Sequence, residues 1–338
     1  MKKTLLFTTC LCLCTAACQK NNGTLPEVSA NAPKTEITFS LCGECLSSPE
    51  KTKATATASE EEAVSLVNLF VFNSDGSLDQ AVSSNSKTIK ANVTTGKGKK
   101  AYAIVNPESD LISTMLTEED LLTAKNTALA DAGTGITFGM SGLTDPTDIE
   151  TTTKDITINV SRVLSKIGIS KITNNLSPSI GALKIKRIYL SNVLTDAYYF
   201  KEENGSGWMH LKGILPSSPL KWLYDNGQDK VINNGKSLEE KHSFYCCPNY
   251  TVQESATDKF TKLVVEAEIN GKQSFYPISL NSIIDGGKIQ KNHFYDITEL
   301  IIKHYGSPDP DTPLSNMDIE FTVKVTPWIE KSLSPVLL

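Results

Sequence analysis

The stretch that decides the fold class is VSLVNLFVF at residues 64–72, followed by the turn formers NSDG at 73–76. Apolar and β-branched residues dominate the first segment, and the Asn, Asp and Gly residues end it, which predicts a β-strand and a turn. Many short strands separated by such turns are typical of β-sandwiches. The pattern recurs, and we expect further strands at residues 36–41, 87–93, 101–105, 155–160, 167–172, 182–190, 262–269, 275–280, 295–302 and 319–325.

One helix is expected in this strand-rich chain. Thr117 is a suitable N-cap residue, and three acidic residues follow it. Acidic side chains in the first turn favour a helix because they lie at its positive end. We therefore predict a helix from Thr117 to Lys125, and we expect residues 133–146, which are rich in Gly, Thr and Asp, to form a loop.

The amino terminus has the features of an export signal. Two lysines precede a short apolar segment, and the small residues TAA at 15–17 lead into Cys18. The apolar segment is too short for a membrane span, and the small residues before a cysteine resemble a bacterial lipobox. We predict a lipoprotein signal peptide at residues 1–17 and lipidation of Cys18, which anchors the precursor to the outer membrane. An ordinary signal peptide with an incidental cysteine is the alternative.

Composition disfavours several classes of function. The chain has 338 residues, 39% of them hydrophobic, and a formal net charge of -5. This length suggests two domains. Basic residues do not cluster, so we expect no nucleic acid as a partner. Arg162 and Arg187 are the arginines of the chain, which disfavours an Arg-based phosphate or nucleotide clamp.

Four cysteines follow the predicted lipidation site, namely Cys42, Cys45, Cys246 and Cys247. In exported proteins thiols usually form disulfides, and we favour a local Cys42–Cys45 bridge or free thiols. The CGEC spacing at 42–45 also fits a pair of zinc ligands. The adjacent Cys246 and Cys247 would point to opposite sides of a strand, however, so we predict no metal site.

Nothing in the sequence predicts catalysis. The four histidines, at positions 210, 242, 293 and 304, lack metal-binding spacing, and neither a Gly-rich phosphate loop nor a serine nucleophile motif occurs. His242 and the cysteine pair would lie too far apart along a strand to act together. The acidic, proline-rich residues 308–313 lack the ligand pattern of a calcium loop, and we expect a linker there. We therefore predict no enzyme activity and no cofactor.

Several phrases in the second half of the chain occur together in one known family. They are IQKNHFYDI at 289–297, GSPDPD at 306–311 and FTVKVTPW at 321–328. Their order and spacing resemble the carboxyl-terminal signature of the major fimbrial subunit (fimbrillin) family of Bacteroidota, the type V pilins. Residues 67–76, 102–107 and 160–167 resemble family phrases of the first half.

The resemblance implies an all-β fold with two transthyretin-like Greek-key β-sandwich domains in tandem. It also implies a subunit of a cell-surface fimbria that supports adhesion, with other copies of itself and other fimbrial subunits as partners. In this family a surface protease removes the lipid anchor and the first strand, and the carboxyl-terminal strand of the next subunit replaces them. The expected parts are a lipidated leader at 18–53, sandwiches at 54–162 and 163–328, and a donor tail at 329–338.

The removable strand would be residues 36–41, an edge strand with Ile37, Phe39 and Leu41 facing inward. Loss of an edge strand bares backbone N–H and C=O groups and an apolar trough, and a strand from another chain repairs both losses.

The cut would fall in the polar segment 47–62, which we expect to be accessible to proteases. Lys53 and Lys51 are the predicted cut sites, with Lys53 preferred, because no arginine occurs before Arg162. Family members are known that are cut after arginine, so the identity of the protease stays open. A plain flexible linker is the alternative for this segment.

The donor strand would lie within residues 329–338, where Leu333, Val336, Leu337 and Leu338 are the apolar residues expected to fill the trough. Pro335 lacks a backbone N–H and suits only an edge position or a bend. The alternative is a tail that folds back on its own domain.

Two other functions stay open. A fimbrial anchor would keep its lipid and a tip subunit would lack a donor tail, so the tail favours a shaft subunit. A surface glycan-binding lipoprotein is an alternative of a different class. Trp208, Trp222, Tyr198 and Tyr199 could stack on sugars, although we expect these rings to pack in the core or in loops.

Overall fold

The computed structural model describes residues 32–43, 45–46, 63–127, 129, 138–314, 318–328 and 330–331. By their contacts, residues 32–338 form a single compact unit. Within the described part of the chain, no helix is long and apolar enough to cross a membrane.

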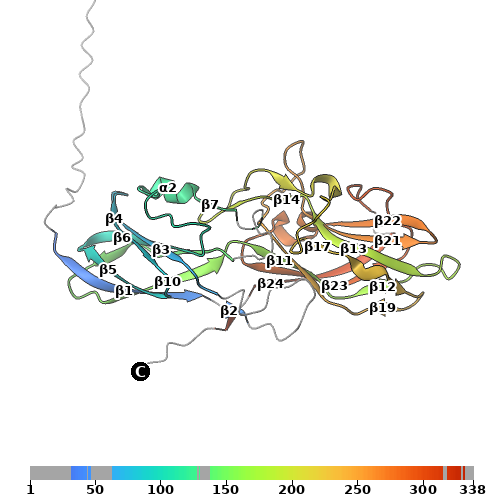
Figure 1. Ribbon diagram of the computed structural model, residues 1–338, viewed down its shortest axis with the longest axis horizontal. Coiled ribbons are helices and arrows are strands. Elements are labelled where there is room, and N and C mark those ends of the chain that lie inside the picture. The colour runs from blue at the N-terminus through green and yellow to red at the C-terminus, as the bar shows by residue number, and fades with distance from the viewer. Residues whose placement is uncertain are drawn as a thin grey trace, which may run out of the picture. The chain divides into compact units, whose positions relative to one another are not determined.

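The first half of the unit forms an eight-stranded sheet with the order β4-β3-β6-β8-β10-β1-β5, in which β9 also pairs with β6. Figure 1 shows β1 beside β10 in this half. The strands are β1 (Lys34–Gly43), β3 (Val67–Phe72), β4 (Leu78–Ser84), β5 (Thr88–Thr94), β6 (Gly96–Val105), β8 (Met140–Leu143), β9 (Thr147–Ile149) and β10 (Asp155–Arg162).

The sheet encloses an apolar core that follows from the alternation of its strands. In β1 and β5 every second residue is buried, because side chains of a strand point to opposite faces in turn. These residues meet Val67, Leu69 and Val71 of β3 and alternate residues of β6 and β10. The first half is therefore a β-sandwich with its own core.

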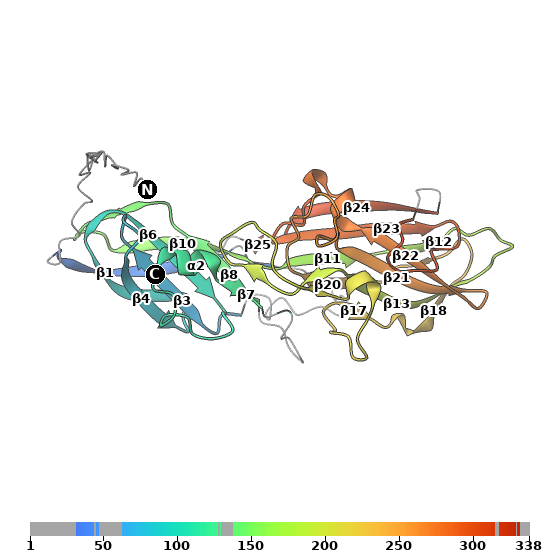
Figure 2. The ribbon, with the colours of Figure 1, turned by 90° about the horizontal axis from the view of Figure 1, so that it is seen from above.

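The second half contains two further sheets, drawn from yellow-green to red in Figure 2. One has the order β19-β12-β23-β11-β20 with β24 on β23, and the other has the order β17-β13-β21-β22 with β18 on β13. The first comprises β11 (Ser165–Ile169), β12 (Ile172–Asn174), β19 (Ser237–Leu238), β20 (His242–Cys246), β23 (His293–Ile302) and β24 (Ile319–Pro327). The second comprises β13 (Leu183–Ser191), β17 (Tyr224–Asp225), β18 (Lys230–Ile232), β21 (Lys262–Ile269) and β22 (Lys272–Ser279).

A larger apolar core runs between these two sheets and reaches the first half. All six residues of β3 are buried, because Phe70 and Phe72 on its second face pack into this larger core while its other side chains face the smaller one. The continuous apolar run at 67–72 is therefore a strand buried on both faces.

The remaining elements are short. Three small ladders join β14 (Val193–Leu194) to β16 (Trp208–Met209), β15 (Ala197–Tyr198) to β7 (Lys125–Asn126), and β2 (Cys45–Leu46) to β25 (Glu330–Lys331). The helical segments are α2 (Glu118–Thr123), α3 (Leu280–Ile283), η1 (Leu211–Gly213), η2 (Gly227–Asp229) and η3 (Asp285–Gly287).

The predicted helix is present as α2. Thr117 caps it, and Thr117 and Asp120 form a reciprocal capping box. Leu121 is buried and attaches the helix to the larger core.

The prediction of an all-β chain with tandem β-sandwiches is confirmed, with several local differences. The strand expected at 167–172 is two strands, β11 and β12, and β4 was not expected. Residues 140–143, expected as loop, form β8 between β6 and β10. Gly142 permits that strand, because a Cβ atom there would lie 2.1 Å from the carbonyl oxygen of Asn159.

Candidate functional site

The strand predicted to be removable, β1, is an internal strand of its sheet. It pairs in antiparallel fashion with β5 from Lys34 to Ser40 and in parallel fashion with β10 from Thr38 to Gly43. The expectation of an edge strand was therefore wrong, and β5 is the outer strand on this side of the described sheet. Both partners of β1 lie far from it in the sequence. A local sequence pattern therefore does not reveal these two pairings.

The backbone of β1 donates hydrogen bonds to both neighbours. The N–H of Thr38 donates to the carbonyl of Lys154 at 2.8 Å, and the N–H of Leu41 donates to the carbonyl of Lys87 at 2.8 Å. Loss of β1 would therefore open two rows of hydrogen-bonding groups that face each other, one on β5 and one on β10. We call this space between β5 and β10 the slot. A strand that enters it has to form hydrogen bonds on both sides, which is a stricter requirement than pairing with a single edge.

The inner face of β1 fills the bottom of this slot. Ile37 and Phe39 are fully buried and Leu41 is 9% exposed, and all three lie in the smaller core. Each buried side chain of this size stabilises the fold by about 1.5–3 kcal/mol relative to an exposed one. Without β1, the apolar side chains of Ile89, Val93 and Ile158 would lose these contacts.

The outer face of β1 is polar and lightly held. Lys90 on β5 forms an ion pair with Glu36 at 3.0 Å, with both side chains mostly exposed. Cys42 is a free, exposed thiol, and it lies opposite Asn159 of β10. Free thiols were one of the two expectations for Cys42 and Cys45, and the side chain of Cys45 lies outside the described residues.

No disulfide joins Cys42 of β1 to Cys246 or Cys247 in the second half. Cys246 and Cys247 are free and buried in the larger core. Burial raises the pKa of the Cys246 thiol to about 12 and that of Cys247 well above its usual range, so both thiols stay protonated and weakly reactive.

Several predicted site residues lie outside the described part of the chain. They are Cys18, the cut sites Lys51 and Lys53, and the donor residues Leu333, Val336, Leu337 and Leu338. Their roles stay predictions. Close to two of these segments, β2 pairs with β25, with Cys45 opposite Lys331 and Leu46 opposite Glu330.

The chain before the predicted donor tail is firmly anchored by Trp328. Its indole is 1% exposed, and its backbone N–H donates to the carbonyl of Asn292 at 2.8 Å. The ring stacks on Tyr245 with centroids 5.5 Å apart and meets Phe138 edge-on at 5.8 Å, while the guanidinium of Arg162 lies 4.8 Å from its centre. Aromatic and cation–π contacts of this kind each contribute about 0.5–1.5 kcal/mol.

This anchor connects both halves of the unit at the point where the tail begins. Phe138 and Arg162 belong to the first half, whereas Tyr245 and Asn292 belong to the second. In the sequence, Trp328 stands out only as the last residue of a family phrase. The signal that could have found it is a large aromatic residue placed directly before a segment expected to leave the domain.

The described residues provide no arrangement typical of a catalytic centre. No group of three or more His, Cys, Asp or Glu side chains among them could hold a metal ion. His210 is buried, which lowers its pKa, and its Nδ1 bonds the carbonyl of Leu190 at 2.8 Å. His242 is also buried, with Nδ1 at 3.3 Å from a carboxylate oxygen of Asp225. Both histidines have structural partners.

The four aromatic residues considered for sugar stacking are in different environments. Tyr199 and Trp222 are buried in the larger core, as expected for packing residues. Tyr198 is half-buried under the ammonium group of Lys125, which lies 4.7 Å from its ring centre. Trp208 is half-buried and borders a surface pocket.

Comparison with known proteins points to one family. The family model of the major fimbrial subunit protein (FimA) matches residues 35–176, which begins at β1 and ends just after β12. The resemblance to the fimbrillin family is thereby confirmed and supports a fimbrial, adhesive role at the cell surface. No curated protein matches the sequence.

Solved structures share the fold across both sandwiches. A fimbrilin from Porphyromonas gingivalis W83 has a TM-score of 0.63 at 12% identity, with 88% of this chain and 98% of that chain covered. A candidate cell adhesion protein from Bacteroides eggerthii has a TM-score of 0.62 at 21% identity, with 89% and 98% covered. The tip fimbrial protein Mfa3 from Porphyromonas gingivalis, with a carboxyl-terminal truncation, has a TM-score of 0.50 at 11% identity, with 87% and 100% covered.

Proposed function

We propose that this chain is a fimbrial shaft subunit that polymerises when β1 is released and the carboxyl-terminal tail of another copy takes its place. The observation that carries the proposal is the position of β1, which lies between β5 and β10 and fills the smaller core with Ile37, Phe39 and Leu41. Removal of such a strand creates a slot that only another strand can fill well.

The tail of a second copy suits this slot in several respects. It is apolar at Leu333, Val336, Leu337 and Leu338, and it follows Trp328, whose burial holds the chain directly before it. The slot and the tail come from different segments of the chain, so a contact between two copies is head-to-tail and extends into a fibre.

The precursor in this proposal is a lipoprotein. Cys18 carries the lipid that holds it at the outer membrane, and a surface protease cuts at Lys53 or Lys51 to free the subunit. The match to the fimbrial family supports this route, and it supports a structural role without enzyme activity.

The first test is controlled cleavage of the purified precursor. A lysine-specific protease should convert the monomer into oligomers measured by light scattering with size-exclusion chromatography, whereas a Lys51→Ala/Lys53→Ala variant should stay monomeric. A cut wild-type protein that stays monomeric over a long incubation would contradict the shaft assignment.

A second test uses the exposed thiol of Cys42 to hold β1 in place. Cys42 and Asn159 lie opposite each other and both face outward, so Asn159→Cys should allow a disulfide between neighbouring strands. After the cut, the oxidised variant should not assemble and the reduced variant should. Asn159→Ser is the matched control, and assembly of the fully oxidised variant would contradict the release of β1.

Deletion of residues 329–338 separates the shaft role from other fimbrial roles. The truncated protein should fold, because Trp328 and the three large sheets remain and only the short ladder of β2 with β25 is lost. Its slot should accept the tail of an intact subunit. It should not extend a fibre further. If fibres of truncated protein alone grow normally, the donor lies elsewhere in the chain.

A further inference from the structure

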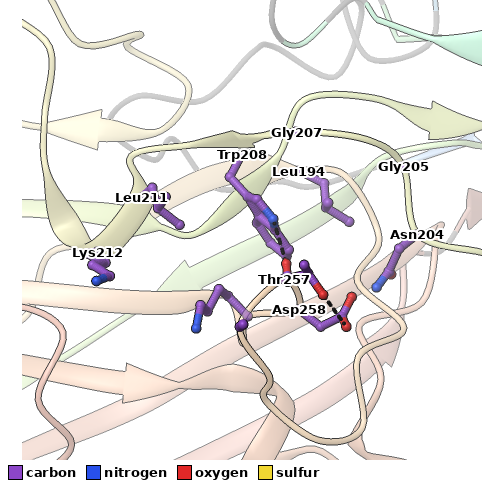
Figure 3. A pocket seen from close by; sticks show the side chains of 11 residues that line it. Leu194, Asn204, Gly205, Gly207, Trp208, Leu211, Lys212, Thr257 and Asp258 are labelled. Carbon is purple, nitrogen blue, oxygen red and sulfur yellow. Dashed lines mark hydrogen bonds between the residues drawn. The ribbon is translucent and has the colours of Figure 1, made fainter.

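A surface pocket of about 680 Å³ lies beside Trp208, in the second half of the chain. Its walls are formed by Leu194, by residues 204, 205, 207, 208, 211 and 212, and by residues 256–259 (Figure 3). Its volume lies in the range of about 300–1,000 Å³ that is usual for small-molecule sites. The pocket is remote from the slot in sequence, and the proposed assembly uses none of its residues.

The indole of Trp208 is held in a defined orientation. Its Nε1–H donates to the carbonyl oxygen of Thr257 at 3.0 Å, so the edge of the ring is tied to the opposite wall. Figure 3 shows the ring between the side chains of Leu211 and Leu194 in that view. The pocket therefore combines a fixed aromatic ring with two aliphatic side chains.

Charged groups of both signs complete the lining. Asp258 and Lys212 are exposed and border the pocket. The Oδ2 atom of Asp258 accepts hydrogen bonds from the hydroxyls of Ser255 and Thr257 at 2.8 and 3.1 Å, which positions the carboxylate. The pocket thus offers an acceptor and a donor next to an apolar surface.

The wall that carries Lys212 is built with backbone strain. His210 and Lys212 both have left-handed backbone, with φ of 49° and 55°, a conformation that costs non-glycine residues on the order of 1–3 kcal/mol. Gly213 beside them also has positive φ, and a Cβ there would lie 2.6 Å from Pro310. Such strain persists where surrounding contacts over-determine it, and it gathers at ligand sites.

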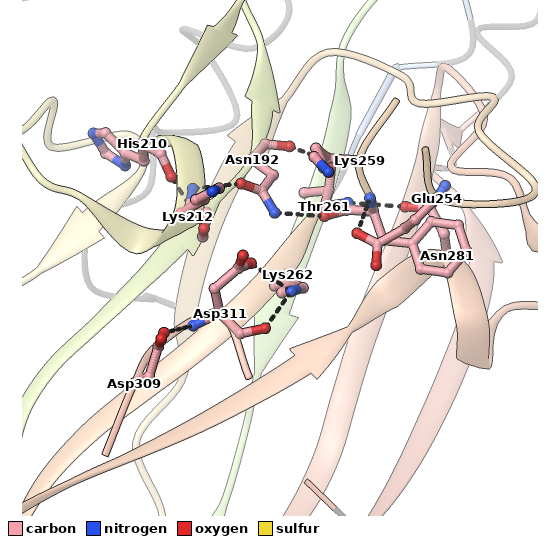
Figure 4. Close-up of polar contacts among 12 residues, drawn as sticks. Asn192, His210, Lys212, Glu254, Lys259, Thr261, Lys262, Asn281, Asp309 and Asp311 are labelled. Carbon is pink, nitrogen blue, oxygen red and sulfur yellow. Dashed lines mark hydrogen bonds and ion pairs between the residues drawn. The ribbon is translucent and has the colours of Figure 1, made fainter. Parts of the chain in front are cut away.

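Buried polar contacts hold the strained wall, as Figure 4 shows. The backbone N–H of Lys212 donates to Oδ1 of Asn192 at 2.7 Å, and the amide of Asn192 donates to the carbonyl of Phe260 at 3.2 Å. Asn192 is fully buried and joins the two walls through these bonds. Contacts within the protein therefore hold this wall of the pocket in place, which lowers the entropic cost of binding.

We propose that the Trp208 pocket binds a single pyranose residue of a surface saccharide. A sugar ring has an apolar face of C–H groups that can cover an indole, and hydroxyls at its rim that both donate and accept hydrogen bonds. The lining matches this mixture, with the indole and two leucines for the ring face and Asp258 and Lys212 for the hydroxyls. Lys259 also borders the pocket, and its Nζ donates to the carbonyl oxygen of Ser255 at 2.6 Å.

Repetition would make a weak site useful. In a fibre each subunit presents one such pocket, so a polymeric glycan could engage several pockets at once with a high effective concentration. The pocket itself is complete in one chain, and its binding can be measured on the uncut monomer, independently of assembly.

The test is saturation-transfer NMR on the uncut monomer with the methyl glycosides of galactose, glucose, mannose, fucose and N-acetylglucosamine as probes. At least one glycoside should receive saturation, and Trp208→Ala should weaken it about tenfold or more, the effect of about 1.4 kcal/mol. Tyr305→Ala is the matched control, because it removes an exposed aromatic ring outside the pocket, and it should change nothing.

A second variant keeps the proposal testable if Trp208→Ala does not fold. Asp258→Asn changes an exposed side chain and should weaken binding about fivefold, the loss of one net hydrogen bond. If none of the five glycosides binds, or if every folded pocket variant binds like the wild type, the proposal is overturned.

Discussion

The two long strands nearest the chain ends, β1 and β24, have opposite positions in their sheets. β1 has partners on both sides and buries Ile37 and Phe39 completely. β24 pairs with β23, the one partner it has among the described strands, and its Val325 is 44% exposed. An edge strand is easier to remove, yet only the loss of an internal strand leaves a slot. Whether a strand from another chain can replace a strand therefore depends more on the neighbours on its two sides than on how weakly it is bound.

The largest expected difference between the two strands is in apolar burial. Phe39→Ala should lower the free energy of unfolding by about 3–5 kcal/mol, as is usual for a buried Phe. Phe321→Ala on β24 should cost about 1 kcal/mol, because that ring is half-buried. Guanidinium chloride unfolding of both variants measures this. Equal losses would mean that β1 is no better embedded than an edge strand.

Proline substitution separates the strands by their hydrogen bonds. Thr38→Pro removes the N–H that bonds Lys154 and should cost about 2–3 kcal/mol through the unsatisfied partner. Directly after β24, the N–H of Trp328 donates to the carbonyl of Asn292, next to β23. Successive N–H groups of a strand point in turn toward and away from its partner, so the N–H of Val325 points away from β23. Val325→Pro should therefore cost less than about 1 kcal/mol. Thermal unfolding compares the two, and a larger loss for Val325→Pro would contradict this assignment of the outer edge.

Acid should weaken the connection before β24 and leave the apolar contacts of β1 unaffected. Burial acts to raise the pKa of Asp311, but the Lys262 ammonium at 2.6 Å outweighs it and holds that pKa below its usual value. A carboxylate with a lowered folded pKa stabilises the fold above its unfolded pKa of about 3.9, and the contribution is lost as pH falls through the folded pKa.

Asp311→Asn should remove this pH dependence and lower the free energy of unfolding by about 1–2 kcal/mol at pH 7. Lys262 then stays buried without a carboxylate beside it, and the loss is limited because the site of Asp311 is partly open to water. Urea unfolding between pH 2 and 7 gives both quantities. If the variant and the wild type lose stability in parallel on acidification, this pair is not the acid-sensitive contact.

The smallest effects are expected from surface ion pairs, which should not distinguish the two strands. Lys90 pairs with Glu36 on β1 at 3.0 Å, and Lys303 pairs with Glu320 on β24 at 2.6 Å. Lys90→Ala and Lys303→Ala should each cost less than about 0.5 kcal/mol and even less in high salt. A salt-sensitive loss above 1 kcal/mol at Lys90 alone would mean that charge also retains β1.

Local sequence patterns predicted those parts of the fold that local physics controls. The strand at 262–269 has the predicted bounds, and α2 lies within the predicted helix because Thr117 and its acidic neighbours form a cap. β8 was missed because Ser141 and Gly142 lack the bulk that marks a strand. Its partners β6 and β10 supply the pairing that its own sequence does not favour.

The site was predicted less completely because it depends on distant partners. Alternation correctly indicated which side chains of β1 face inward, but no pattern within residues 36–41 tells whether a strand lies inside a sheet or at its edge. The cluster around Trp328 joins residues from separate segments for the same reason. The Trp208 pocket likewise depends on loops that meet only in the folded chain.

The pairing of β1 with β10 also has a consequence for timing. The hydroxyl of Thr35 donates to the carbonyl of Thr151, 116 residues further along the chain. During synthesis or export, β1 can therefore dock only after most of the first sandwich has emerged. During that interval its covalent tether keeps it at a high local concentration beside its own slot, which discourages premature engagement by a neighbour. In the proposed assembly a backbone cut would end that advantage, because β1 and an incoming tail would then compete as separate chains.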